Sequence, residues 1–365
     1  MNPSPKNSQL KTHNSKLKTH NSKLTMPRFL DSLIFILTAV ALTSGCSSPG
    51  NAAKETLGQW AEAESPAPGD VANSSPLGDF NADSAYNYLA RQVAFGPRVP
   101  NSDEHKLTGD WLVAELNRHG GQVSQQKAIL KAFDGTNLNA RNIFARFPSK
   151  NPEKGKEAPI LLLAHWDSRP WADKDPDPDK RNLPVDGAND GASGVAILLE
   201  IARQLSLNPV DKNIDILFVD AEDWGEDGDE DSWALGTKYF VENPPIKGYS
   251  PYAAILLDMV GGQGATFCRE YFSERSAPHL AEAIWQTASK LGYGSFFLNR
   301  MGGAILDDHV QLIKAGIPAI DIIEYHSNDD TGFNDRWHTT SDNLEGISKE
   351  TLQAVGSTLL NFLRN

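Results

Sequence analysis

The feature that most constrains the fold is an alternation, after about residue 80, of short apolar segments with segments of helical periodicity. Each apolar segment has the length of a strand. Several are apolar at nearly every position, which is typical of strands covered on both faces. The segments are 141–147, 159–164, 214–219, 253–257, 295–298 and 319–323.

Helical patterns lie between these segments. Residues 103–119, for example, place Leu107, Trp111, Leu112 and Leu116 on one face, and Gly120-Gly121 follows. The other predicted helices are 192–207, 276–291, 309–315 and 349–363. Strands that alternate with helices predict an α/β fold. We expect a three-layer sandwich in which helices flank a central mixed, mostly parallel twisted sheet, formed by one domain over residues 80–365.

Four of the six apolar segments are followed by a potential metal ligand or an acid, namely His165, Asp220 to Asp223, Asp258 and His338. Asp190 begins a helix within the glycine-rich loop 187–194. Taken singly, each acid also fits a helix cap or a lysine partner. Together they end neighbouring elements of one sheet, where functional residues gather, so we expect them to converge. Oxygen and nitrogen ligands without thiolate suit a catalytic Zn²⁺.

Five motifs occur in a characteristic order: His165-x-Asp167-Ser168, Gly-Ala-Asn-Asp190-Gly-x-Ser-Gly, Asp-x-Glu222-Asp223, Leu-Leu-Asp258 and Trp-His338-Thr. This set resembles the co-catalytic zinc aminopeptidases. More closely, it resembles the animal-type (type II) glutaminyl-peptide cyclotransferases and their relatives in Bacteroidetes-like bacteria. The resemblance runs from about residue 80 to the end of the chain and implies the zinc-aminopeptidase-like fold.

The two families that the sequence resembles, the peptidases and the cyclases, imply different metal sites. Two-zinc peptidases would use five ligands: His165, Asp190, Asp223, Asp258 and His338. In the cyclases the resemblance implies one zinc per chain, bound by Asp190, Asp223 and His338, with His165 and Asp258 lining the inner wall. All five side chains are present, so the number of ligands does not distinguish a two-zinc peptidase from a one-zinc cyclase.

Two features favour the cyclase. The segment Leu306-Asp307-Asp308-His309 resembles a cyclase segment whose second acid, Asp308, joins Asp258 and Glu222 in a proton-handling network. The two acids also fit an N-cap and a first-turn acid of the helix that follows. Trp337, directly before His338, is placed to wall the substrate pocket. The long segment 167–186 also resembles the bacterial cyclases.

The resemblance has two departures. Asp223 replaces a glutamate of the animal enzymes, so its shorter side chain has to be brought closer by the backbone. Gly228 stands where the animal enzymes have a pocket tryptophan, and Trp224 or Trp233 is expected to substitute.

The expected reaction converts N-terminal Gln of peptides and proteins into pyroglutamate and releases ammonia. Zinc would polarise the γ-carbonyl, and Glu222 would carry a proton from the attacking amine to the departing ammonia. Asp258 and Asp308 should raise the pKa of Glu222. A two-zinc aminopeptidase, with Glu222 as the base, and a non-catalytic surface lipoprotein are the alternatives.

The first 79 residues predict export. We interpret 1–25 as a non-native upstream segment, 26–45 as a signal peptide, and 46–79 as a flexible tether. Thr43-Ser44-Gly45-Cys46 resembles a bacterial lipoprotein box, which implies a lipidated Cys46 in the cell envelope, on the periplasmic side of the inner or outer membrane. A plain secretory signal is the alternative.

The formal net charge of −13 excludes nucleic acid as a partner, and we expect a monomer. Cys268 is expected to be a buried lone thiol. Residues 173–179 and 226–231 are dense runs of acids. The spacing of Asp227, Asp229 and Asp231 resembles that of calcium loops, but Ser232 and Lys238 stand where such a loop needs Gly and Glu, so we expect solvated or substrate-facing loops.

Overall fold

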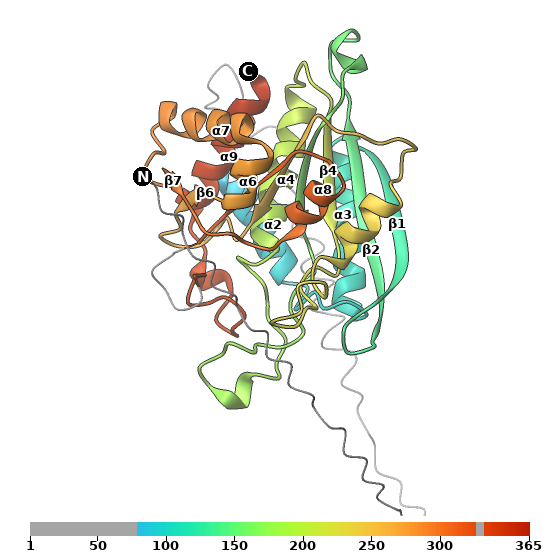
Figure 1. The fold of residues 1–365 in the computed structure, drawn as a ribbon, viewed down its shortest axis with the longest axis vertical. Coiled ribbons are helices and arrows are strands. Elements are labelled where there is room, and N and C mark those ends of the chain that lie inside the picture. The colour runs from blue at the N-terminus through green and yellow to red at the C-terminus, as the bar shows by residue number, and fades with distance from the viewer. Residues whose placement is uncertain (1–78, 326–331) are drawn as a thin grey trace, which may run out of the picture. The chain divides into compact units, whose positions relative to one another are not determined.

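The structure is a computed structural model that describes residues 79–325 and 332–365. Its main sheet has six strands in the order β1-β2-β4-β3-β5-β8. Figure 1 shows β1 and β2 together at one side of the molecule. Strands β4, β3, β5 and β8 run parallel, and β2 and β1 extend the sheet in antiparallel fashion on one side. The bounds are β1 Gln122–Lys131, β2 Asn137–Phe147, β3 Ile160–His165, β4 Ile214–Val219, β5 Ala253–Asp258 and β8 Ala319–Ile323.

The remaining elements are mostly helical. The α-helices are α2 Ala82–Val93, α3 Asp103–Arg118, α4 Ala192–Leu207, α5 Leu235–Glu242, α6 Tyr271–Ser276, α7 Pro278–Lys290, α8 Asp308–Lys314 and α9 Lys349–Arg364. Short 3₁₀ helices are η1 Lys154–Lys156, η2 Pro178–Lys180 and η3 Leu344–Gly346. A second, two-stranded parallel sheet pairs β6 Phe267–Arg269 with β7 Phe297–Met301.

The parallel strands are buried on both faces because each face packs against helices. In β3, Leu162 and Ala164 belong to a large core that also contains residues of α2, α4, α7 and α9. Leu161 and Leu163 point to the opposite face and join a smaller core with Phe240 of α5 and Leu312 of α8. Successive side chains of a strand face opposite sides, so a continuously apolar segment fits a sheet between two helical layers. The predicted three-layer sandwich is confirmed.

Some elements differ from the sequence prediction. The segment 295–298 contributes to β7, which lies in the small sheet and not in the main one. β1 was not predicted, because most of its side chains are polar and none is fully buried along this edge strand. The helices α2, α5 and α6 and the strand β6 were also not predicted.

The predictions for the start of the chain concern residues 1–79, and all but Asp79 lie outside the described residues. Within the described ranges, no helix combines the length and the apolar character needed to cross a membrane. Cys268 is buried, as predicted, and its sulfur accepts a hydrogen bond from Nε of Arg300.

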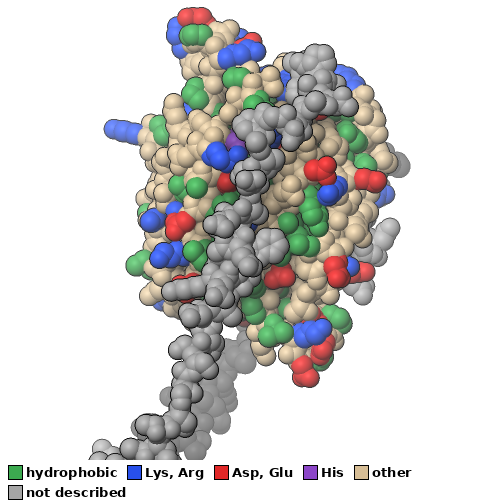
Figure 2. Space-filling model, turned by 180° about the vertical axis from the view of Figure 1, so that it is seen from behind, with side chains coloured by type: hydrophobic (Ala, Val, Ile, Leu, Met, Phe, Trp, Pro, Cys, Tyr) green, Lys and Arg blue, Asp and Glu red, His purple; other side chains and the backbone are tan. Residues whose placement is uncertain are grey.

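Basic side chains do not form a continuous patch on the described surface visible in Figure 2, where Lys and Arg alternate with Asp and Glu. On this face, the described residues present charges of both signs.

Candidate metal centre and active site

Two neighbouring parallel strands place the first pair of polar side chains. His165 is the last residue of β3, and Asp258 is the last residue of β5. Their side chains meet, with His165 Nε2 3.2 Å from Asp258 Oδ1. The same nitrogen lies 2.9 Å from Oδ1 of Asp190, which comes from the loop before α4. Parallel strands thus deliver donors to one edge of the sheet.

The other oxygen of Asp190 faces a second group. His338 Nε2 lies 3.6 Å from Asp190 Oδ2 and 3.1 Å from Asp223 Oδ1. The shorter Asp223 side chain therefore reaches the site. The structure contains two triads of buried donors within 4.8 Å of one another, His165–Asp190–Asp258 and Asp190–Asp223–His338, and they share Asp190.

Glycines allow the loop before α4 to approach this site. Gly191 has φ of +83°, and a Cβ there would lie 2.8 Å from Cε1 of His165. At Gly194 a Cβ would lie 2.2 Å from the carbonyl oxygen of Leu257 in β5. The glycine-rich motif therefore permits close packing of α4 on the strands that carry His165 and Asp258.

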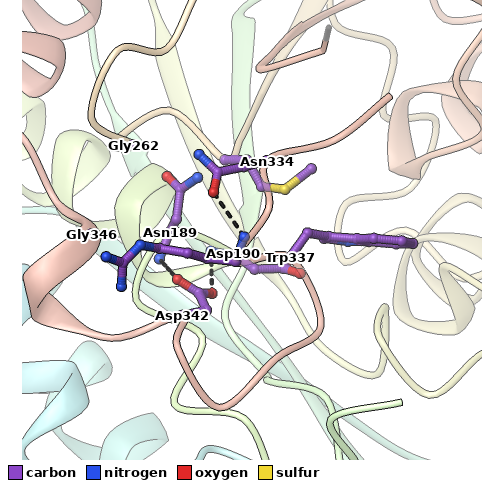
Figure 3. Close-up of a pocket in the computed structure, with 9 residues that line it drawn as sticks. Asn189, Asp190, Gly262, Asn334, Trp337, Asp342 and Gly346 are labelled. Atoms are coloured by element: carbon purple, nitrogen blue, oxygen red, sulfur yellow. Dashed lines mark hydrogen bonds between the residues drawn. The ribbon is translucent and has the colours of Figure 1, made fainter. Parts of the chain in front are cut away.

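Two further carboxylates hold the backbone of the donors. Asp342 accepts hydrogen bonds from the backbone N–H groups of Asn189 and Asp190, at 2.8 and 3.1 Å (Figure 3). Asp167 accepts from the N–H groups of Glu222 and Asp223, both at 3.2 Å. Figure 3 also shows that Asn189, Asp190 and Asp342 line a small cavity, of about 10 Å³. Asp342 was not among the predicted site residues, because a loop acid gives no distinct signal in the sequence.

The backbone is strained where the donors emerge. Ala221, Met259 and His338 adopt left-handed conformations, with φ of 54°, 46° and 54°. Ala221 directly precedes Glu222, Met259 directly follows Asp258, and His338 itself carries an imidazole donor. Such conformations cost about 1–3 kcal/mol each in residues other than glycine and cluster at functional sites.

The donor set fits zinc. Its five side chains are three carboxylates and two imidazoles, all buried, and no thiolate is among them. In each histidine Nε2 faces the triad, while Nδ1 faces another carboxylate: Asp167 at 3.6 Å from His165, and Asp173 at 3.5 Å from His338. A ligand imidazole commonly has this arrangement, because the second nitrogen then keeps its proton. The residues present can therefore hold Zn²⁺.

A group of acids lies beside the triads. Burial raises the pKa of Glu222 well above its ordinary value, and neighbouring carboxylates raise it further, in the order Asp307, Asp223 and Asp308. Burial and the carboxylate of Asp307 raise the pKa of Asp258 to about 7, against the opposing effect of His165. Burial also raises the pKa of Asp308 well above its usual range.

Asp307 thus raises the pKa of Glu222 more than Asp308 does. From the sequence we expected Asp308 to join Asp258 and Glu222 in a proton-handling network, and we interpreted Asp307 as a helix cap. Asp307 does cap α8, and its carboxylate is buried at the same time. Asp307 also belongs, with His309 and Asp321, to a third group of donors that are close enough to share an ion. Glu270 Oε2 lies 3.2 Å from His309 Nε2.

Aromatic rings flank His338. The Trp337 ring stacks on the imidazole with a centroid distance of 3.8 Å, and Trp233 lies nearly parallel to it at 6.0 Å. Trp224 packs elsewhere, against Trp171 and a small cluster that contains Ala132. Of the two candidate tryptophans, Trp233 is therefore the one beside the donors.

The acidic runs show no donor group of the kind found at the triads. Among the described residues, the three groups that could share an ion do not include the run 226–231. Asp227 pairs with Lys174, and Asp231 lies 4.0 Å from Lys238. Residues 226–231 are exposed, as expected of a solvated loop, whereas in the run 173–179 Asp175 is buried and Asp173 is half-buried.

Comparison with known proteins decides the family. The profile described as Peptidase family M28 matches residues 142–363. The chain belongs to Peptidase family M28. Aminopeptidase YwaD of Bacillus subtilis is 30% identical over 266 residues, which cover 71% of this chain and 52% of that protein. The M28 chain spans about half to three fifths of the length of the first curated relatives it matches.

Solved structures of bacterial members are more similar. A Zn-dependent exopeptidase from Parabacteroides distasonis is 52% identical, with a TM-score of 0.76, and the match covers 79% of the M28 chain and 99% of that chain. The glutaminyl cyclase of Porphyromonas gingivalis is 51% identical, with a TM-score of 0.75 and coverage of 78% and 98%. The M28 family and these neighbours support a zinc enzyme of the cyclase or aminopeptidase type.

Because both triads contain Asp190, its replacement tests the centre as a whole. We expect Asp190→Asn to weaken zinc binding at least about tenfold, since a neutral amide replaces the shared anionic donor. Zinc content after dialysis, measured by mass spectrometry, checks this. Asp227→Asn, in an exposed loop, serves as the matched control. Full zinc content in the Asp190 variant would contradict the assignment.

Proposed function

We propose that this M28 protein is a zinc-dependent glutaminyl-peptide cyclotransferase, which closes N-terminal Gln of peptides into pyroglutamate and releases ammonia. The observation that carries the proposal is the group of buried acids around Glu222. Asp307 and Asp308, at the start of α8, raise the pKa of Glu222, and Asp307 also raises that of Asp258 at the end of β5, so the site has to keep protons on some of these acids. Proton storage suits a reaction that moves a proton between two nitrogen atoms.

The metal would be one zinc, bound by Asp190, Asp223 and His338, and when bound it would act as a Lewis acid toward the γ-carbonyl oxygen. Glu222 is the proposed proton carrier, because burial and the neighbouring carboxylates raise its pKa and so favour a carboxyl that can hold a proton. It would accept a proton from the α-amine and pass one to the leaving ammonia. Asp258 and Asp308, together with Asp307, would maintain that pKa through like charge.

The surroundings of His338 support a compact pocket for the glutamine side chain. Trp337 and Trp233 stack near the imidazole and would form apolar walls, while His165 would line the inner side. Ring closure joins two parts of one molecule, so holding the folded-back conformer supplies much of the acceleration. The carboxylates also suit a substrate that arrives with a cationic amino terminus.

An aminopeptidase is the second candidate, and a specific observation favours it. The triad His165–Asp190–Asp258 is as compact as the other, so a second zinc could bind there, with Glu222 as the base. Burial raises the pKa of Asp258 to about 7, and burial also raises the pKa of Asp223, so protonation of the ligands does not separate the two candidates and the substrate test does.

Export and lipid attachment at Cys46 are proposed from the sequence alone. We expect the full chain, expressed in a bacterium with a lipoprotein pathway, to partition into the detergent phase of a membrane extract. Cys46→Ser should move it to the aqueous phase, since the acyl chains supply the membrane affinity. Equal partitioning of both proteins would contradict lipidation at this residue.

The reaction itself is tested with two substrates. We expect a peptide with N-terminal Gln to lose the mass of one ammonia, because the amine displaces the amide nitrogen. Leucine amide should give no free leucine above the rate without enzyme. Mass spectrometry and an ammonia assay check both. Release of free amino acid, with the Gln peptide uncyclised, would favour the aminopeptidase.

Glu222→Gln tests the proton carrier. We expect it to bind zinc as the wild type does and to lose about 10²- to 10⁴-fold in kcat, because the amide cannot transfer the proton. Steady-state kinetics and metal analysis of the same samples check this. Glu226→Gln, an exposed neighbour, should retain its activity. A Glu222 variant with near wild-type turnover would remove Glu222 from the mechanism.

A further inference from the structure

The orientation of His338 depends on its second ring nitrogen. Nε2 faces Asp223 and Asp190, and Nδ1 faces Oδ1 of Asp173 at 3.5 Å. The imidazole is almost fully buried, and within the described residues Nδ1 has no partner at hydrogen-bond geometry. An imidazole that binds metal through Nε2 carries its proton on Nδ1, and this proton needs an acceptor. Asp173 is the carboxylate in place to accept it.

Arg169 connects Asp173 to the second donor of the same triad. Its guanidinium is buried and binds Asp173 with two nitrogens, Nε at 2.7 Å from Oδ1 and Nη2 at 3.2 Å from Oδ2. Nη1 donates to the backbone oxygen of Asp223 at 3.0 Å and lies 3.4 Å from Oδ1 of the same residue. The fork geometry of arginine allows it to fix both partners at once.

The guanidinium is also confined from its sides. It lies over the ring of Trp171 at 5.2 Å and over that of Trp233 at 4.8 Å. Trp233 is the ring that stacks near His338. Arg169 therefore has few alternative positions. A side chain that is held rigidly also fixes the positions of the side chains that it contacts.

The segment that carries these two residues is attached to the backbone of His338. The N–H of Lys174 donates to the carbonyl of His338 at 3.1 Å. Asp175 accepts from the backbone N–H and from the hydroxyl of Thr340, at 2.9 and 2.6 Å. His338 itself has a left-handed backbone, which persists only where neighbouring contacts enforce it.

We propose that Asp173 and Arg169 are positioning residues of the zinc centre: Asp173 fixes the His338 ring with Nε2 toward the metal, and Arg169 fixes Asp223. The segment 167–186 thereby belongs to the metal site. The inference rests on the triad Asp190–Asp223–His338 and is independent of which reaction the protein catalyses, because the triad serves both candidate functions.

Zinc affinity of the full chain, measured by competition with a chromogenic chelator, tests the proposal. We expect Asp173→Ala to weaken zinc binding about 10- to 100-fold, the usual effect of removing such a partner. Asp173→Glu should recover most of this loss, because it restores an acceptor. Arg169→Lys should also weaken binding, since a lysine keeps the charge but cannot bind both partners in the same geometry.

A spectroscopic measurement separates positioning from general stability. With Co²⁺ in place of zinc, Asp173→Ala should shift or weaken the visible absorption band, which reports ligand geometry. Asp179→Ala removes an exposed acid from the same segment and should leave both affinity and spectrum unchanged. Folded Asp173→Ala with zinc affinity within about twofold of wild type, well short of the tenfold expected, would overturn the proposal. An equal loss in Asp179→Ala would also overturn it, because the effect would then be one of net charge.

Discussion

Asp190 is the residue on which the rest of the site depends. Its two carboxylate oxygens face two histidines that are far apart in the sequence, His165 and His338, and each histidine has a further acid beside it. Three buried carboxylates at this spacing repel one another unless protons or cations lie between them. The fold holds these carboxylates together at the carboxyl edge of the sheet, where Asp342 and Asp167 accept hydrogen bonds from the backbone N–H groups that carry or precede them. A bound cation would relieve the repulsion.

The acids at and beside the triads bear on the two activities considered. A hydrolase that activates water on two metal ions needs Asp258 as an anion. Burial and the carboxylate of Asp307 raise the pKa of Asp258 to about 7, and burial and the carboxylate of Asp190 raise the pKa of Asp223 as well. A metal ion at either triad therefore has to displace protons. The acids beside Glu222, namely Asp307 and Asp308, would suit a transfer of protons between two nitrogen atoms.

Much of the fold was predictable, and the failures have physical causes. The buried parallel strands and the helix at 192–207 are apolar enough to be found by pattern, and α4 has the predicted bounds. β1 lies at an edge, so water covers one of its faces and its sequence is mostly polar. For the site, strand-end residues such as His165 and Asp258 were predictable because sheet geometry fixes where they point. Asp307, Asp342 and Asp173 were not assigned roles, because an acid in a loop or at a helix start has the same sequence signal when it is solvated.

The close contact between Gly194 and the carbonyl of Leu257 has a consequence for how this scaffold changes its chemistry. Helix α4 and strand β5 touch through backbone atoms, so the distance between the carboxylates of Asp190 and Asp258 is set by the main chain. Side-chain replacements around them can alter protonation or metal occupancy while the frame stays fixed. One fixed frame can therefore carry different protonation states or metal occupancies at these acids without remodelling of the fold.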